Sequence, residues 1–161
     1  LSPSRLKTVE LPAKMSRLLG KLSGKQVEGE LQKAQAVSNQ HVAAMVRNVD
    51  CPQGQAAHMQ TAKAYMSSRL SGDQATCLRL VSDNIHFVSQ RDGEFQGKAP
   101  FQQYLGRTKV EGTWNEPRIG EGGLVHIDGQ IKWMGVLPVA VKGVFRFGRD
   151  GRVEELFVGK R

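Results

Sequence analysis

The sequence predicts an α+β fold in which a curved antiparallel β-sheet wraps around three helices, behind a basic, helical N-terminal extension. Apolar residues recur at helical spacing before residue 82 and again from residue 98, whereas residues 114–158 are mostly runs of strand character. The dipeptides Asp128-Gly129 and Asp150-Gly151 each lie between two such runs, and Asp-Gly is a strong hairpin-turn signal. Helices followed by a meander of strands are typical of α+β domains.

Three helices are expected in the body of the chain, each with a recognisable start or stop. The first covers residues 55–70 and ends at Gly72, because glycine readily adopts the left-handed conformation that closes a helix. The second is short, covers residues 74–81, and is capped by the side chain of Asp73. The third begins at Lys98 and has a proline in its first turn, where no backbone N–H is needed.

Strands are expected wherever short β-type runs are bounded by turn signals. Residues 85–89 are expected to pair with a return strand across a turn at residues 91–94. In residues 139–147, apolar side chains alternate with Lys142 and Arg146, which is the pattern of a half-buried strand. The remaining candidate strands are residues 114–119, 122–127, 130–137 and 152–158.

Residues 1–50 are expected to form an extension, followed by a domain over residues 55–161, because a Cys-Pro-Gln-Gly sequence breaks the chain between them. Residues 26–49 carry one apolar stripe, which predicts a long helix that must be buried against something. Residues 1–25 hold six lysines and arginines and one acidic residue, and four of these cations flank a small amphipathic helix: Lys14, Arg17, Lys21 and Lys25. This segment is interpreted as a solvated arm, a partner-binding segment, or a contact with an acidic membrane or nucleic-acid surface.

The composition narrows the function classes. The net charge of +8 resides mainly in the first 25 residues, so the domain itself is only mildly basic. No run approaches the ~18 apolar residues of a transmembrane helix. The two cysteines form no disulfide framework, no phosphate-binding glycine loop or metal-ligand spacing stands out, and no cofactor or metal is expected. The basicity and the non-methionine start predict an organellar location, in a mitochondrion or plastid.

A series of motifs resembles the nuclear transport factor 2-like superfamily. The motifs are Tyr65, Gly72-Asp73 and residues 80–84, then a hairpin, then Gly97-Lys98-Ala99 opening a helix. Residues 145–153 resemble the penultimate hairpin of the same superfamily. The resemblance covers residues 55–160 and implies the cystatin-like cone fold of SnoaL-like proteins. Ketosteroid isomerases, polyketide cyclases and dehydratases share that fold with non-catalytic proteins, so the fold does not choose the function.

The same resemblance allows a test of catalysis. Ketosteroid isomerases use a carboxylate base together with a tyrosine and a protonated carboxylic acid. By motif spacing the tyrosine falls on Tyr65, the base on Val88 and the acid on Gly143, so isomerase chemistry of this kind is not expected. An inward-facing His86 beside Tyr65 would instead form an acid/base pair; an outward-facing histidine is the alternative. The residues expected to line the cone pocket are Tyr65, His86, Val88, Phe101, Trp133 and Phe145.

These observations lead to three hypotheses of function. The first is a non-catalytic accessory or scaffold subunit of a larger, organellar protein assembly. It would bind other subunits through the N-terminal extension and through an open sheet face that carries Lys142 and Arg146, which could also form a homodimer. The second is a SnoaL-like small-molecule-binding protein, or an enzyme of isomerase, cyclase or dehydratase type, that uses the cone pocket. The third is nucleic-acid contact through the basic arm.

Overall fold

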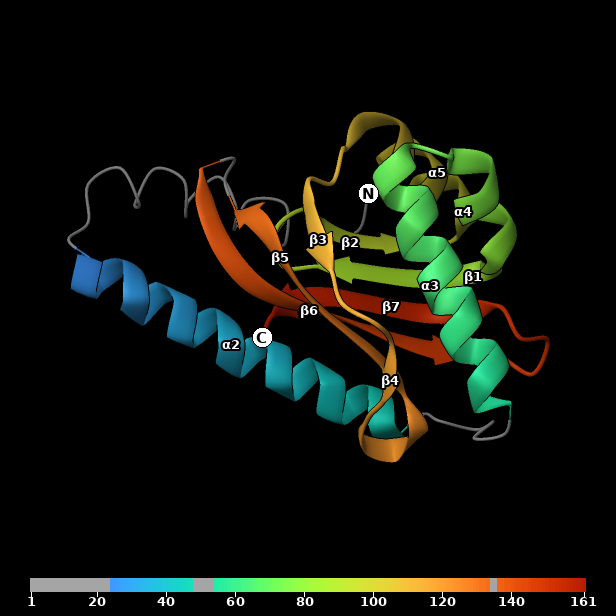
Figure 1. The fold of residues 1–161 in the computed structure, drawn as a ribbon, viewed down its shortest axis with the longest axis horizontal. Coiled ribbons are helices and arrows are strands. Elements are labelled where there is room, and N and C mark those ends of the chain that lie inside the picture. The colour runs from blue at the N-terminus through green and yellow to red at the C-terminus, as the bar shows by residue number, and fades with distance from the viewer. Residues whose placement is uncertain (1–23, 48–53, 134–135) are drawn as a thin grey trace.

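The computed structural model describes residues 24–47, 54–133 and 136–161 (Figure 1). Its helices are α2 (Gly24–Arg47), α3 (Gln55–Ser71), α4 (Gln74–Leu80) and α5 (Lys98–Arg107), with a short 3₁₀ helix, η1 (Glu121–Gly123). Its strands are β1 (Val81–Ser89), β2 (Gly93–Gln96), β3 (Gly112–Trp114), β4 (Arg118–Ile119), β5 (Val125–Trp133), β6 (Leu137–Phe147) and β7 (Val153–Lys160).

The strands form one seven-stranded sheet in the order β2-β1-β7-β6-β5-β3, with β4 also paired to β5. All pairs are antiparallel except β1 with β7, so the sheet is mixed at that single junction. Helices α3, α4 and α5 lie on one side of the curved sheet, and α2 crosses the other (Figure 1). We call these the cone face, which carries Phe87 and Phe145, and the α2 face, which carries Val144 and Phe157.

The main core lies between the cone face and its three helices. Tyr65 from α3 and Phe101 from α5 pack with Phe145 from β6, and all three side chains are buried. The local signals that place these helices act as predicted. Gly72 ends α3 in the left-handed conformation with φ of 80°, and the Asp73 carboxylate accepts hydrogen bonds from the backbone and side chain of Thr76.

Helix α2 buries part of the apolar stripe that its sequence predicts, whereas Val37, which belongs to that stripe, is exposed. Ala34, Val42 and Met45 are buried, and the last two pack with Val144 and Phe157 on the sheet. The second half of the expected extension, residues 24–47, thus packs on the sheet as α2. Residues 1–23, including the predicted small amphipathic helix, lie outside the described residues.

Two predictions about the sheet are wrong. Asp128-Gly129 is not a hairpin turn, because both residues lie within β5 and pair with Lys142 and Val141 of β6. The connection between these strands lies after Trp133 instead, where the sequence carries no Asp-Gly signal. The strand expected over residues 114–119 is divided between β3 and β4, which pair with different parts of β5.

Candidate functional site

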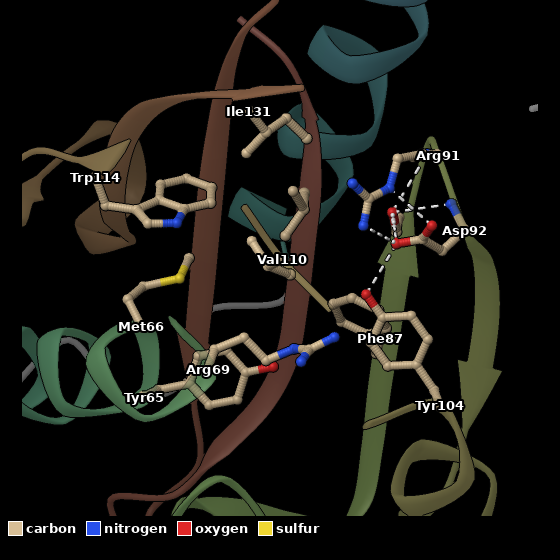
Figure 2. A pocket seen from close by; sticks show the side chains of 12 residues that line it. Tyr65, Met66, Arg69, Phe87, Arg91, Asp92, Tyr104, Val110, Trp114 and Ile131 are labelled. Carbon is tan, nitrogen blue, oxygen red and sulfur yellow. Dashed lines mark hydrogen bonds and ion pairs between the residues drawn. The ribbon is translucent and has the colours of Figure 1, made fainter. Parts of the chain in front are cut away.

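A cavity lies on the cone face, between α3, α5 and the sheet (Figure 2). Its volume is about 30 Å³, and it is partly open to solvent. Since one water needs roughly 10–15 Å³ of such volume, the cavity holds a group of only a few atoms. The lining residues are Tyr65, Met66, Arg69, Phe87, Ser89, Arg91, Asp92, Tyr104, Val110, Trp114, Ile131 and Val158.

Asp92 is the only carboxylate among these lining residues, and its oxygens already accept several hydrogen bonds. Arg91 donates from Nε at 2.8 Å and from Nη2 at 3.0 Å. The hydroxyls of Tyr104 and Ser89 donate to Oδ2 at 2.9 and 3.3 Å (Figure 2). Burial, and then the charge of Asp92, raise the pKa of Tyr104 far above its ordinary value, so this phenol stays a donor. The carboxylate is thereby held as an ion-paired structural group.

Arg69, in contrast, has no carboxylate partner among the described residues. Its side chain is 8% exposed, and its Nη2 atom is buried with no hydrogen-bond partner in the described part of the chain. The guanidinium carbon lies 5.1 Å from the centre of the Tyr104 ring, which is a cation–π contact (Figure 2). A buried donor without an acceptor costs about 1–3 kcal/mol, and more when it is charged. The cavity therefore contains a donor that a ligand could satisfy.

Trp114 supplies a second such donor. Its Nε1 atom is buried and has no hydrogen-bond partner among the described residues, and its ring lines the same cavity (Figure 2). Tyr65 lies beside Arg69 on α3. Burial raises the pKa of Tyr65 well above its ordinary value, Cys77 and Tyr104 raise it further, and Arg69 offsets part of the rise. All three groups are therefore hydrogen-bond donors at neutral pH.

Of the six residues expected to line the pocket, Tyr65 lies in the cavity wall. Phe101 and Phe145 are buried next to it in the core and do not line the cavity. The expectation for His86 and Val88 is corrected, because alternation along β1 directs Phe87 and Ser89 to the cone face and their neighbours to the α2 face. The side chain of Trp133 lies outside the described residues.

His86 is therefore separated from Tyr65 by the sheet, and the acid/base pair does not form. Its Nε2 atom lies 2.8 Å from a Glu94 oxygen and its Nδ1 atom 3.2 Å from Glu155. Hydrogen bonding to Glu155 is the main cause that raises the pKa of His86; burial opposes it and Glu94 reinforces it. Helix α2 contributes His41, whose Nε2 atom lies 3.1 Å from the same Glu155 oxygen. This cluster fastens α2 to the sheet.

The two sheet cations expected to bind a partner are engaged within the chain. Lys142 donates to Asn39 of α2 at 2.9 Å, and Arg146 pairs with Glu154 and Glu155. The sheet face expected to be open is thus covered along these residues by the chain's own helix. Of the extension residues, Lys14, Arg17 and Lys21 lie outside the described residues, as does the side chain of Lys25.

The two positions that the resemblance assigns to the isomerase base and acid carry neither group. Val88 packs on the α2 face, and Gly143 faces the cone, where an added Cβ would lie 2.7 Å from Met66 Cε and 3.8 Å from the Trp114 ring.

Sequence reasoning missed two residues of the cavity wall, Arg69 and Asp92. Arg69 follows Tyr65 by one helical turn, a spacing that could have identified it, whereas Asp92 was interpreted only as a turn residue.

The described residues contain no group of three or more His, Cys, Asp or Glu side chains placed to hold a metal ion. None of the described helices is long and apolar enough to cross a membrane.

No protein-family model and no curated protein sequence matches this chain. Solved structures do match its fold. A nuclear transport factor 2-like protein of unknown function from Cytophaga hutchinsonii is 15% identical with a TM-score of 0.54, over 63% of this chain and 87% of that one. An uncharacterized cystatin-fold protein from Novosphingobium aromaticivorans is 17% identical with a TM-score of 0.53, over 63% and 96%.

A third similar structure is SalBIII, an epoxide hydrolase/cyclase-like enzyme with a role in pyran ring formation in the polyether salinomycin. It is 14% identical with a TM-score of 0.56, over 66% of this chain and 92% of that one. Together these similarities show that the chain has the nuclear transport factor 2-like, SnoaL-like cone fold, as the motif resemblance predicts. At this identity they show the fold alone.

Proposed function

We propose that this chain is a small-molecule-binding protein that holds its ligand in the cone-face cavity. The observation that supports the proposal is the pair of buried donors, Arg69 Nη2 and Trp114 Nε1, which line one cavity and lack acceptors in the described structure. Buried polar groups are almost always hydrogen-bonded in folded proteins. A ligand that supplies acceptor atoms would satisfy both donors once small side-chain movements uncover them, since neighbouring atoms cover both in the described structure.

The proposed role is binding, without the acid/base chemistry of the isomerases. A general base needs a free lone pair within reach of the substrate proton. Asp92 shares its oxygens with Arg91, Ser89 and Tyr104, so the chain's own donors already engage this carboxylate. The remaining polar groups in the cavity wall are donors, which suit recognition of acceptor atoms.

Nuclear magnetic resonance of the ¹⁵N-labelled full chain tests this proposal. We expect a small acyl compound from a fragment library to shift the Trp114 indole N–H signal and the amide of Ser89, while amides of Ser38 and Val42 on α2 stay unchanged. The Trp114→Phe variant identifies the indole signal and keeps most of the ring. Shifts confined to α2, or no binding by any fragment, would contradict the proposal.

The accessory-subunit role is a second proposal, supported by the charge of residues 1–25 and by the exposed side of α2. Six of these residues are basic and one is acidic, and Val37 is 54% exposed on α2. Deletion of residues 1–23 tests it, since α2 must stay to cover the sheet. We expect the full chain to co-purify with other subunits of an organellar assembly and the truncated chain to lose them. Equal recovery of partners by both chains would contradict this role.

A further inference from the structure

The charges in the cavity wall do not balance. Arg69, Arg91 and Asp92 are the charged residues that line it. Arg91 and Asp92 neutralise each other at 2.8 Å, and the described structure contains no ion pair for Arg69. Arginine keeps its proton at any physiological pH, so burial cannot remove this charge by deprotonation. One net positive charge therefore remains in a largely apolar wall, which favours an anionic ligand.

The position of Arg69 favours a singly charged anion. Arg69 lies in the last turn of α3, where the helix dipole places partial negative charge. Phosphate sites commonly use helix N-termini and several backbone N–H groups, and the lining residues include no N-terminal turn of α3 or α5. A carboxylate has one charge, and its two oxygens match the planar fork of a guanidinium.

The rest of the wall sets the size and polarity of the remainder of the ligand. Met66, Val110 and Ile131 present apolar side chains to the cavity, beside the Trp114 ring (Figure 2). The cavity volume of about 30 Å³ accepts a group of a few atoms, such as a carboxylate, and the rest of the ligand must extend through the open side. The Trp114 N–H is a second donor for an oxygen of the ligand.

We infer that the ligand is a short-chain aliphatic carboxylate whose anionic group pairs with Arg69 and whose chain lies along Met66, Val110 and Trp114. This inference rests on the proposed function and names the ligand class of the same cavity. It distinguishes the site from a pocket for a neutral substrate, because the carboxylate supplies the negative counter-charge that Arg69 lacks in the described structure.

The test compares butyrate with butyramide, which has the same shape and no charge. The Trp114 indole signal of the full chain is followed while each compound is added, with inorganic phosphate as a third probe. We expect butyrate to bind at least tenfold more tightly than butyramide, and phosphate to leave the signal unchanged. Arg69→Met should weaken butyrate binding at least tenfold, whereas Arg79→Met, the same change at an exposed site on α4, should have no effect.

The outcomes separate the two proposals. Equal binding of butyrate and butyramide would overturn the carboxylate inference and leave the ligand-binding function standing. Phosphate binding at the same signal would overturn the choice of carboxylate over phosphate. If no member of the series acetate, butyrate, hexanoate and butyramide shifts the signal, the inference fails, and the fragment screen then decides the proposed function. Should Arg69→Met fail to fold, the comparison of butyrate with butyramide on the unmodified chain still decides.

Discussion

On the α2 face, one buried carboxylate contacts three basic side chains, whereas on the cone face a buried guanidinium contacts no carboxylate in the described structure. Glu155 is 6% exposed and pairs with His41, His86 and Arg146. Arg69 is similarly buried, contacts the Tyr104 ring and the hydroxyls of Tyr65 and Tyr104, and keeps an unpartnered Nη2 atom. The two sites lie against opposite faces of the same sheet. The curvature of the sheet alone therefore does not explain why only one of the two buried charges is paired.

The two faces of the sheet therefore have different roles. Among the described residues, the unpartnered atoms on the α2 side are Ser38 Oγ, which is neutral, His126 Nε2 and Asp128 Oδ1. Burial lowers the pKa of His126 to about 4, so its ring is neutral, and Asp128 pairs through its other oxygen with Arg118 and Arg161. The charged groups there bind one another and hold α2 in place. On the cone face the unpartnered donors are the neutral Trp114 indole and Arg69, which always carries charge. Local rules of polar satisfaction are most often broken where a protein functions.

The largest expected effect is on the α2 face, at Phe157. Its side chain is 1% exposed, packs with Val42 and Met45, and stacks on His41 with ring centres 4.5 Å apart. Phe157→Ala should lower the free energy of unfolding by about 3–5 kcal/mol, because it leaves a cavity under α2. Urea unfolding followed by circular dichroism measures this loss.

The matched control is Val37→Ala, on the exposed side of the same helix. It should change the free energy of unfolding by less than about 0.5 kcal/mol. If Phe157→Ala were as mild as this control, α2 would not be packed on the sheet as described, and the two faces would not differ in the way the comparison requires.

A smaller effect is expected when the shared carboxylate is removed. Glu155→Gln keeps the shape of the side chain but leaves His86 and Arg146 without their common negative partner. We expect a loss of about 2–3 kcal/mol near pH 6, at or below the ~3–5 kcal/mol of a fully broken buried pair, because His86 keeps Glu94 and Arg146 keeps Glu154. Urea unfolding of both proteins at the same pH gives the difference, and Glu116→Gln at an exposed site is the control.

The loss from Glu155→Gln should depend on pH. The pKa of His86 is raised in the folded state, so its contribution is complete below about pH 6.5 and is lost as the pH rises through the raised value. Burial raises the pKa of Glu155, but hydrogen bonds from His41 and His86 outweigh it and lower the pKa. That contribution exists above about pH 4.5 and is lost as the pH falls through the lowered value.

The gap between the two proteins should therefore be widest between about pH 4.5 and 6.5, and narrower at pH 8.5. His126 acts in the opposite direction: its lowered pKa makes both proteins lose stability as the pH falls below about 6.5. That effect cancels when the two proteins are subtracted. A gap that is constant from pH 5.5 to 8.5 would contradict the charge coupling between His86 and Glu155.

Short-range signals predicted much of the fold. The stop at Gly72, the cap at Asp73 and the glycine at the Asp150-Gly151 turn, which has φ of 79°, all lie where the sequence places them. The Asp128-Gly129 signal gave a wrong prediction of a turn, because nine consecutive residue pairs between β5 and β6 override its turn propensity. Strand pairing is a long-range property, and no local signal at those two residues reports it.

The site was harder to predict than the fold, for a related reason. Alternation shows that His86 and Phe87 face opposite ways, but only the packing of α2 and α3 decides which of them faces the cone. Arg69 has an ordinary place on a helix that also exposes polar residues. The sequence does not show that Arg69 has no carboxylate partner in the described structure. The structure shows it, because Arg91, 22 positions later in the chain, forms the ion pair with Asp92.

Among the buried positions, the smallest expected effect on stability belongs to Arg69. Arg69→Met keeps an apolar stem of similar length in the cavity wall and removes a buried donor that has no acceptor in the described structure. We expect the free energy of unfolding to stay within about 1 kcal/mol of the unmodified chain, because replacing a poorly paired buried charge by an apolar side chain is often neutral or stabilising. Urea unfolding at pH 7 measures it beside Arg79→Met. A loss above about 2 kcal/mol would mean that Arg69 holds the fold through its contact with Tyr104, and the reason to assign it to a ligand would disappear.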